Sequence, residues 1–240
     1  MRSLVIARRE FMAYFESPIG YFVVALFPAL AAALFFLVGD LFFSYNEASL
    51  RHFFANMPIL TVIVVPAIAM RTWSEELRSG TIERLSTLPF SLGQMVVGKF
   101  LGVWAVFIFA LICTLLVPIT VDLLGDLDWG PVIAAYLGTT LMAGAALAVC
   151  CFFSATTTNQ IVAWLLGACV LLVFNLIHLI ASAAFVPRLI SELVLQLDFS
   201  QHYASLSRGV IDLGAVVYFT SIAVFFLAAN AASLMARRCR

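Results

Sequence analysis

The chain has 240 residues, of which 64% are hydrophobic and 11% are charged, and its mean hydropathy is +1.09. A soluble domain carries about 25% charged residues, so this composition excludes a water-soluble fold and predicts an integral membrane protein. The formal net charge is zero, which argues against a nucleic-acid partner.

Residues 1–18 are predicted to form an amphipathic helix that lies in the membrane interface. Its apolar face would hold Leu4, Ala7, Phe11, Tyr14 and Phe15. Its polar face would hold Arg9, Glu10, Ala13 and Glu16. The charges exclude a signal peptide, and Pro18 is expected to end the helix.

Six apolar segments follow, each close to the roughly 20 residues that a helix needs to cross a bilayer. They lie at about 19–39, 57–73, 94–119, 131–153, 159–181 and 212–235. Because backbone polar groups in lipid must be satisfied within their own segment, we expect helices. The predicted fold is an all-α integral membrane protein with six transmembrane helices in a single domain, 1–240. Pro28, Pro66 and Pro118 fall within spans and predict kinks.

The distribution of basic residues predicts that both termini are cytoplasmic. The segments that would then be cytoplasmic hold ten basic residues: Arg2, Arg8, Arg9, Arg71, Arg78, Arg84, Lys99, Arg237, Arg238 and Arg240. The outer segments hold three: Arg51, Arg188 and Arg208. This asymmetry follows the positive-inside rule.

Residues 71–91 form a polar island between the second and third spans. Thr72 and Glu75 have capping-box spacing, which predicts a short helix through about Arg78. We expect Ser79 and Gly80 to break that helix.

A second short helix is predicted directly after this break. Thr81 would cap it, Glu83 would lie in its first turn, and Pro89 would end it. Ile82, Leu85 and Leu88 would line one face, an apolar stripe that suits a groove on another protein. An ordinary solvated loop is the alternative. Ser91 and Gln94 form another capping-box pair, at the start of the third span.

Polar residues near the fifth span are candidates for a transport path. Asn175 and His178 lie three residues apart on one face, and residues 182–211, which include Pro187, are too short and too polar to cross the membrane twice. We expect this segment to form two half-helices that cap an internal path from outside. Interhelical hydrogen bonding is the alternative for Asn175 and His178, and also for Asn230. Interfacial anchoring is the alternative for His202, Tyr203 and Arg208.

Catalytic and metal-binding motifs are absent from the sequence. It contains no His-Glu-x-x-His and no Gly-x-Ser-x-Gly, and its three histidines are far apart. The run Gly93-x4-Gly98-Lys99 imitates a phosphate-binding loop, but Phe100 stands where Ser or Thr must bind magnesium. Gly98-x3-Gly102 is better explained as a close helix-packing site.

Two longer runs resemble the membrane subunits of type-2 ABC transporters, in particular the short bacterial branch of gliding-motility and copper-maturation permeases. The first run is Pro66-x3-Met70-Arg71-x3-Glu75-Glu76-x2-Ser79-Gly80-Thr81-x-Glu83-x-Leu85-x3-Pro89, followed by Gly98-Lys99-Phe100-Leu101. The second is Asp198-Phe199-Ser200-x-His202-Tyr203-x-Ser205-x-Ser207-Arg208-Gly209-Val210-Ile211-Asp212. The N-terminal run from Arg9-Glu10-Phe11 to Ser17-Pro18 is similar to the opening interfacial helix of that branch.

The resemblance implies a permease subunit of an exporter in the bacterial cytoplasmic membrane, which is not itself an enzyme. It implies a second membrane subunit, identical or related, and two separate cytoplasmic ATPase subunits that would hold ATP and magnesium. It implies a coupling helix from Ser79 to Leu88, flanked by Glu75, Glu76 and Arg78, and an outer gate formed by the half-helices. It does not fix the substrate.

Two alternatives from other classes stay open at this point. A secondary transporter driven by an ion gradient would need carboxylates at mid-depth in its spans, and none is apparent in the sequence. A membrane scaffold without transport activity could dock a cytosolic protein through the same polar island.

Overall fold

In the computed structural model, residues 2–37, 50–80, 91–181, 195–210 and 212–238 are described, and those residues contain helices and no strands. The helices are α1 (Arg2–Phe15), α2 (Pro18–Phe36), α4 (Arg51–Ala55), α5 (Met57–Ala69), α6 (Arg71–Ser79), α8 (Leu92–Cys113), α9 (Leu116–Leu124), α10 (Trp129–Thr156), α11 (Gln160–Ala181), α13 (Phe199–Ser207) and α14 (Leu213–Arg238). The all-α membrane fold is confirmed.

Five stretches of the described chain are long and apolar enough to cross a membrane. They are Met57–Ser79, Leu92–Leu124, Trp129–Thr156, Gln160–His178 and Leu213–Arg237. A sixth is obtained if the pair α1 and α2, bent by 78°, counts as one span. The bend agrees with an N-terminal helix whose direction differs from that of the first span.

Local sequence signals explain where several of these helices begin and break. The predicted capping box is confirmed at α8, where Ser91 Oγ accepts the Gln94 N–H and Gln94 Oε1 accepts the Ser91 N–H, both at 3.3 Å. Pro118 cannot donate to the carbonyl of Thr114, four residues earlier, and the helix is interrupted there, between α8 and α9. α2 and α5 continue through Pro28 and Pro66.

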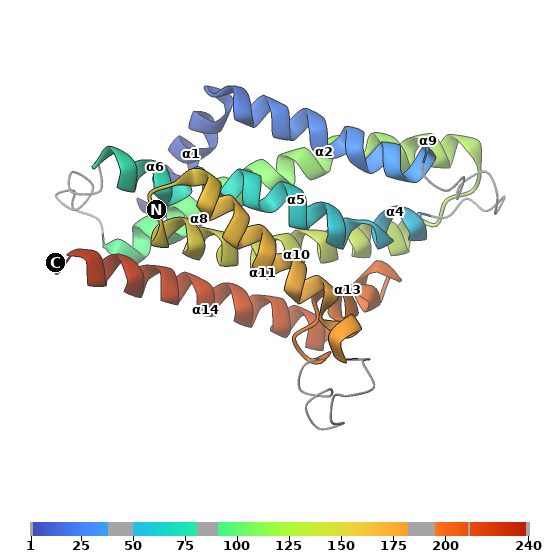
Figure 1. The fold of residues 1–240 in the computed structure, drawn as a ribbon. Helices are drawn as coiled ribbons and strands as arrows, with labels where there is room; N and C mark the ends of the chain where they lie inside the picture. The colour runs from blue at the N-terminus through green and yellow to red at the C-terminus, as the bar shows by residue number, and fades with distance from the viewer. Residues whose placement is uncertain (1, 38–49, 81–90, 182–194, 211, 239–240) are drawn as a thin grey trace.

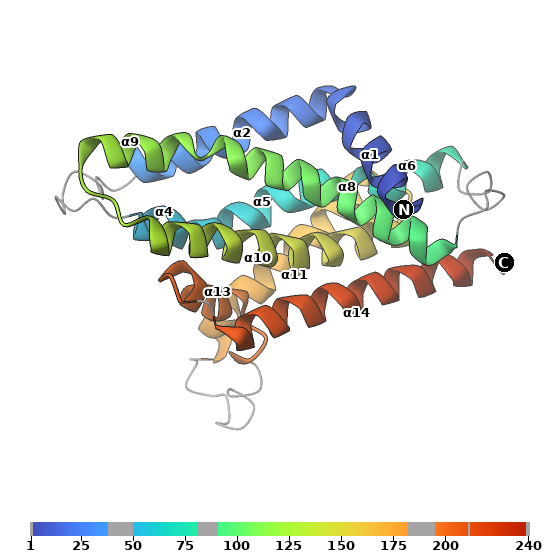
Figure 2. The same ribbon diagram turned by 180° about the vertical axis from the view of Figure 1, so that it is seen from behind.

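The long helices run side by side along one axis of the molecule (Figures 1 and 2). Both termini lie at one end, together with α6, the start of α8 and the α10–α11 turn; we call this the terminal end. α4, the end of α9 and α13 lie at the other end, which we call the opposite end. The described parts of the polar island and of the predicted half-helix region, α6 and α13, are therefore at opposite ends of the bundle.

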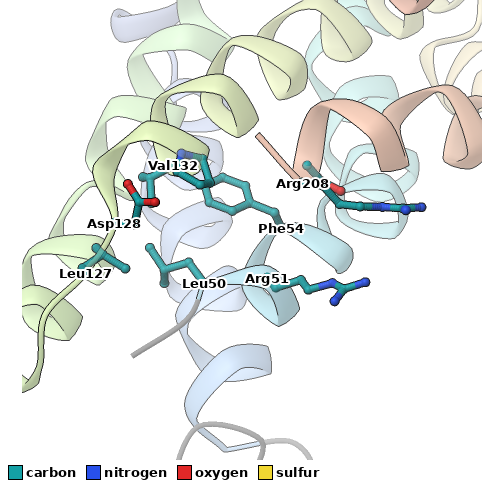
Figure 3. A pocket seen from close by; sticks show the side chains of 9 residues that line it. Leu50, Arg51, Phe54, Leu127, Asp128, Val132 and Arg208 are labelled. Carbon is teal, nitrogen blue, oxygen red and sulfur yellow. The ribbon is translucent and has the colours of Figure 1, made fainter. Parts of the chain in front are cut away.

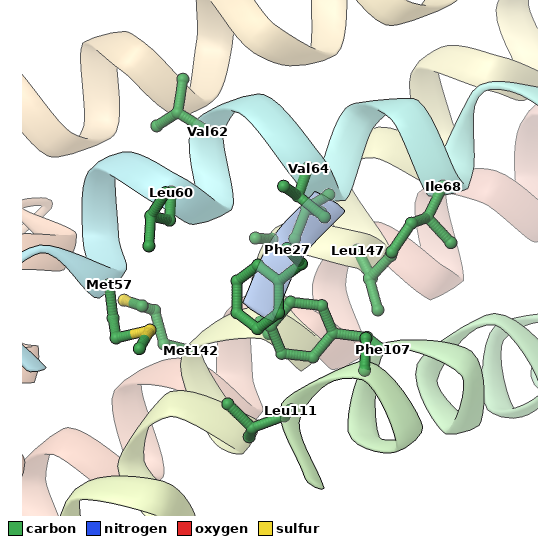
Figure 4. Packing of buried hydrophobic residues seen from close by; sticks show 14 of the residues in the cluster. Phe27, Met57, Leu60, Val62, Val64, Ile68, Phe107, Leu111, Met142 and Leu147 are labelled. Carbon is green, nitrogen blue, oxygen red and sulfur yellow. The ribbon is translucent and has the colours of Figure 1, made fainter. Parts of the chain in front are cut away.

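α5 and α10 form the centre of the bundle. In each of their spans 72% of the most apolar window is buried, against 22% for α11 and 17% for α14. Figure 4 shows side chains of α5 meeting Phe27 of α2, Phe107 of α8 and Met142 of α10. α11 and α14 thus present most of their apolar surface outward, as helices facing lipid or a partner subunit do.

The boundary between the second span and the polar island differs from the prediction. α6 follows α5 after the single residue Met70, and Thr72 lies inside α6, with 3% of its surface exposed. The capping box predicted for Thr72 and Glu75 is therefore wrong, because α6 extends the second span. The break at Gly80 is confirmed, with φ of 67°, a left-handed conformation that glycine adopts without strain.

Candidate functional site

Lys99 is the centre of a buried ionic cluster at the terminal end. Its side chain is 4% exposed, and its ammonium group has three partners. Glu76 Oε1 of α6 lies 2.8 Å away, Glu10 Oε1 of α1 lies 3.1 Å away, and the Thr72 carbonyl accepts a hydrogen bond at 3.0 Å. All three donors of the ammonium are thereby used. We call Glu10, Glu76 and Lys99 the α1–α6–α8 cluster.

The ammonium also lies over the ring of Trp73, with the ring centroid 5.0 Å from Nζ. The cluster carries one positive and two negative charges, and Glu76 Oε2 is buried without a hydrogen-bond partner among the described residues. The short distances from the ammonium to both carboxylates offset part of the cost of burying these charges, and removing one member leaves the others unpaired. The cluster therefore holds its three helices in one arrangement.

Helix α1 reaches the cluster because α8 has no side chain at two positions. A Cβ at Gly102 would lie 2.7 Å from Glu10 Cβ and 2.8 Å from the Ala7 carbonyl oxygen. One at Gly98 would lie 2.8 Å from Ile6 Cβ. The close helix-packing role predicted for Gly98 and Gly102 is confirmed, and its partner is α1.

The polar face predicted for α1 is partly wrong for the same reason. Glu10 was expected to face away from the apolar side, yet its side chain is only 13% exposed and contacts Lys99. One turn further along the same side of α1, the Tyr14 hydroxyl donates to the Ile68 carbonyl of α5 at 2.6 Å. Helix α1 is thus fastened to α5, α6 and α8.

A serine of α10 occupies the break between α5 and α6. Ser154 Oγ accepts the N–H groups of Trp73 and Ser74 at 3.1 and 3.2 Å, and it donates to the Met70 carbonyl at 2.9 Å. In an uninterrupted helix the Ser74 N–H would bind the Met70 carbonyl directly. A side chain inserted in this way is a recognised cause of a helix kink.

Beyond the cluster, α6 presents an exposed polar face. Glu75, Arg78, Ser79 and Gly80 are exposed, and Arg71 donates to Glu75 Oε2 at 2.9 Å and to Ser17 Oγ at 2.6 Å. A cavity of about 280 Å³ lies between this face, α1 and Lys99. Of the predicted coupling residues, Glu75, Glu76, Arg78, Ser79 and Gly80 are therefore on or beside one helix end. The others lie outside the described residues: Thr81, Ile82, Glu83, Leu85 and Leu88.

Asn175 and His178 both contact the segment around α13. Ser200 Oγ donates to the Asn175 carbonyl at 3.2 Å and lies 3.3 Å from its side-chain oxygen, while His178 Nδ1 lies 3.1 Å from Asp198 Oδ2. Asp198 also caps α13 through the Ser200 N–H at 2.8 Å. These contacts favour the interhelical hydrogen-bonding interpretation of Asn175 over a lining of an open path.

The residues predicted for the outer region differ from one another in their surroundings. Tyr203 is 1% exposed and its hydroxyl lies 2.8 Å from Thr139 Oγ1 of α10, so it is a core residue, which disfavours the alternative of interfacial anchoring. Burial raises the pKa of the Tyr203 phenol, which keeps it protonated. His202 stacks on Tyr218 at 4.0 Å, and Arg208 is exposed. Pro187 lies outside the described residues.

Sequence reasoning missed Lys99, Glu10 and Ser154. A signal for Lys99 was present, because it is a cation inside an apolar helix and such residues require a partner. Glu10 could not be assigned to it, since 89 residues separate them. Ser154 gave no signal, because the backbone groups that it binds become available only where two helices meet.

No group of three His, Cys, Asp or Glu side chains within the described ranges is placed to hold a metal ion. Comparison with protein families finds that the family described as ABC-2 family transporter protein matches residues 40–231. No curated protein matches the chain.

Proposed function

The chain belongs to the ABC-2 family of transporter proteins, and we propose that it is the permease subunit of an exporter driven by separate ATPase subunits. Membership makes it a multi-pass membrane component that associates with an ATP-binding cassette component. The proposal adds that ATP and magnesium are held by a cytoplasmic ATPase dimer and that a second membrane subunit, identical or related, completes the path.

The α1–α6–α8 cluster is the observation that carries this proposal. Helix α6 ends at Ser79, where the proposed coupling helix, Ser79 to Leu88, would begin. A force applied there would act on α6 and, through Glu76, on Lys99 of α8 and Glu10 of α1. One contact point would thus move three helices together.

The same geometry suggests how the motion would reach the opposite end. Helix α8 continues into α9, and α6 continues into α5, which forms part of the bundle centre. Helices displaced at the terminal end would shift as rigid bodies about the Ser154 break, opening or closing the other end. This is the rocking motion that we propose for transport.

The proposed orientation places the terminal end in the cytoplasm of a bacterium. Arg8, Arg9, Arg71, Arg78 and Lys99 belong to the helices α1, α6 and α8 at that end, as the positive-inside rule requires. Arg51 and Arg208 belong to α4 and the end of α13, at the opposite end.

Reconstitution with an ATP-binding cassette ATPase encoded beside the chain tests the function. We expect the two proteins to co-purify and the permease to stimulate ATP hydrolysis. Glu76→Gln, which leaves Lys99 with one carboxylate, should reduce that stimulation several-fold without abolishing co-purification. Glu16→Gln is the matched control, since Glu16 is an exposed carboxylate in the α1–α2 connection.

Different outcomes separate the alternatives. Co-purification without any stimulation of ATP hydrolysis would identify a docking scaffold. Substrate movement that follows an imposed ion gradient and needs no ATPase would identify a secondary transporter. Equal stimulation by Glu76→Gln and the unaltered protein would exclude the cluster from coupling.

A further inference from the structure

A second cavity lies at the opposite end, about 340 Å³ in volume, where α4, the start of α10 and the end of α13 meet. Figure 3 shows Arg51 and Arg208 on one side of it and Asp128 on the other. Leu50, Phe54 and Val132 form its apolar floor, and each is at most 3% exposed. A cavity of this size can accept a small polar group together with several carbon atoms.

The two arginines converge on this cavity from distant parts of the sequence. The opposite end has few basic residues, and two of them, Arg51 and Arg208, line a single pocket. Arg208 Nε donates to the Ala204 carbonyl at 3.2 Å, and the terminal nitrogens of Arg208 make no hydrogen bond or ion pair within the described chain. The terminal nitrogens of Arg208 can therefore bind an anion without breaking a contact within the described chain.

The backbone holds Arg208 firmly at the pocket rim. Gly209 has φ of 88°, and a Cβ there would lie 2.8 Å from Pro131 Cα, so this turn packs directly on the start of α10. Among the described residues that line the pocket, Asp128 is the only carboxylate, and it is occupied as the N-cap of α10, where it accepts the Gly130 N–H at 3.0 Å. Within this described lining there are two guanidinium groups and one carboxylate.

We propose that this pocket binds the phosphate headgroup of an anionic amphiphile, with the guanidinium groups holding the phosphate and the apolar floor contacting the first carbons of the tail. Guanidinium matches the geometry of phosphate oxygens better than any other side chain. The chemistry of the ligand follows from the pocket alone. That the pocket lies on the outer side, where the ligand would be an outer-leaflet lipid or an exported lipid, rests on the proposed orientation.

Three probes that differ by one chemical part test the proposal on the purified full chain in a neutral detergent. Dihexanoyl phosphatidic acid carries phosphate and tails, dihexanoylglycerol carries only tails, and glycerol 3-phosphate carries only phosphate. Titration calorimetry should give saturable binding of the phosphatidic acid, at least tenfold tighter than that of either other probe. Because no ATPase is present, a failure of the proposed transport function does not affect the result.

Variants assign the binding to the pocket. Arg208→Gln should weaken phosphatidic acid binding about tenfold, the loss of one charge-assisted contact, and Arg208→Lys should restore part of it. Arg78→Gln, an exposed arginine at the terminal end, is the matched control and should bind normally. Thermal unfolding should be the same for all the variants.

Either of two results would overturn the proposal. One is equal binding of phosphatidic acid by Arg208→Gln and by Arg78→Gln. The other is binding of dihexanoylglycerol as tight as that of phosphatidic acid, which would show that the pocket does not recognise the phosphate group. If glycerol 3-phosphate bound as tightly as phosphatidic acid, a soluble phosphate ester would replace the amphiphile.

Discussion

At the scale of single residues, Lys99 should be the most sensitive position at the terminal end. Lys99→Met keeps the length of the side chain but leaves Glu10 and Glu76 as unpaired buried carboxylates. Removing one member of a buried ion pair costs about 3 kcal/mol or more. We therefore expect a thermal unfolding midpoint several degrees lower in detergent, measured by intrinsic fluorescence.

A triple variant separates the charge from the packing. Lys99→Met combined with Glu10→Gln and Glu76→Gln removes all three charges, so it should recover a large part of the stability lost in Lys99→Met. If the triple variant were as unstable as the sum of its single changes, the residues would be contributing independently. The cluster would then not be a unit.

The sequence predicts the kinds of residue in this site better than their partners. Glu76 and Gly80 were expected on functional grounds, and both lie at the end of α6. The pairing of Glu10 with Lys99 depends on the 78° bend after α1 and on the absence of side chains at Gly98 and Gly102. Such a contact is decided by the packing of distant helices, which local periodicity does not contain.

At the scale of helices, the contact between α1 and α8 should fail when a methyl group is added to it. In Gly102→Ala the new Cβ would lie 2.8 Å from the Ala7 carbonyl oxygen, so α1 must move away and Glu10 with it. Overpacking of this kind costs about 1–3 kcal/mol. We expect a lower unfolding midpoint and weaker stimulation of the ATPase.

Gly93→Ala is a control within the same helix. A Cβ at Gly93 has nothing within 4 Å, and alanine favours the helix. Its unfolding midpoint should be unchanged or higher. A midpoint in Gly102→Ala equal to that of Gly93→Ala would show that α1 does not depend on the close approach.

The break between α5 and α6 gives a second prediction at this scale. Ser154→Ala removes the hydroxyl that bonds Trp73, Ser74 and Met70, leaving buried backbone groups unsatisfied unless the helix straightens. Either response should lower stability by about 1–2 kcal/mol, as seen in thermal unfolding. Thr156→Ala, two residues later and exposed, loses only a local bond to Phe153 and should unfold like the unaltered protein.

This break also marks where prediction of helices from the sequence ends. Hydropathy located the spans well, because lipid leaves a helix as the only economical backbone. It placed the end of the second span at residue 73, whereas α6 continues to Ser79 with Thr72, Trp73 and Ser74 buried. Hydropathy registers polarity, and Ser74, the first residue after the predicted end, is polar but buried, with its N–H bonded to Ser154 of α10.

At the scale of the whole molecule, the two ends have different chemistry. The terminal end holds the ionic cluster and the exposed face of α6, whereas the opposite end holds the arginine-lined pocket, and an apolar core centred on α5 and α10 separates them. Transport requires that the two ends change together. A probe that reports the state of one end during ATP hydrolysis therefore tests the mechanism directly.

Lys99 supplies that probe, because it is the only lysine in the sequence. Its Nζ is enclosed by Glu10, Glu76, Thr72 and Trp73, so an amine-reactive ester should modify it slowly in the resting protein. If the coupling motion separates α6 from α8, the rate of modification should rise several-fold when the partner ATPase hydrolyses ATP. Mass spectrometry of the Lys99 peptide measures this rate, and the terminal amine provides an internal reference. A rate unchanged by ATP, in a complex whose ATPase activity is stimulated, would mean that the cluster stays closed and that the bundle moves as one body around it.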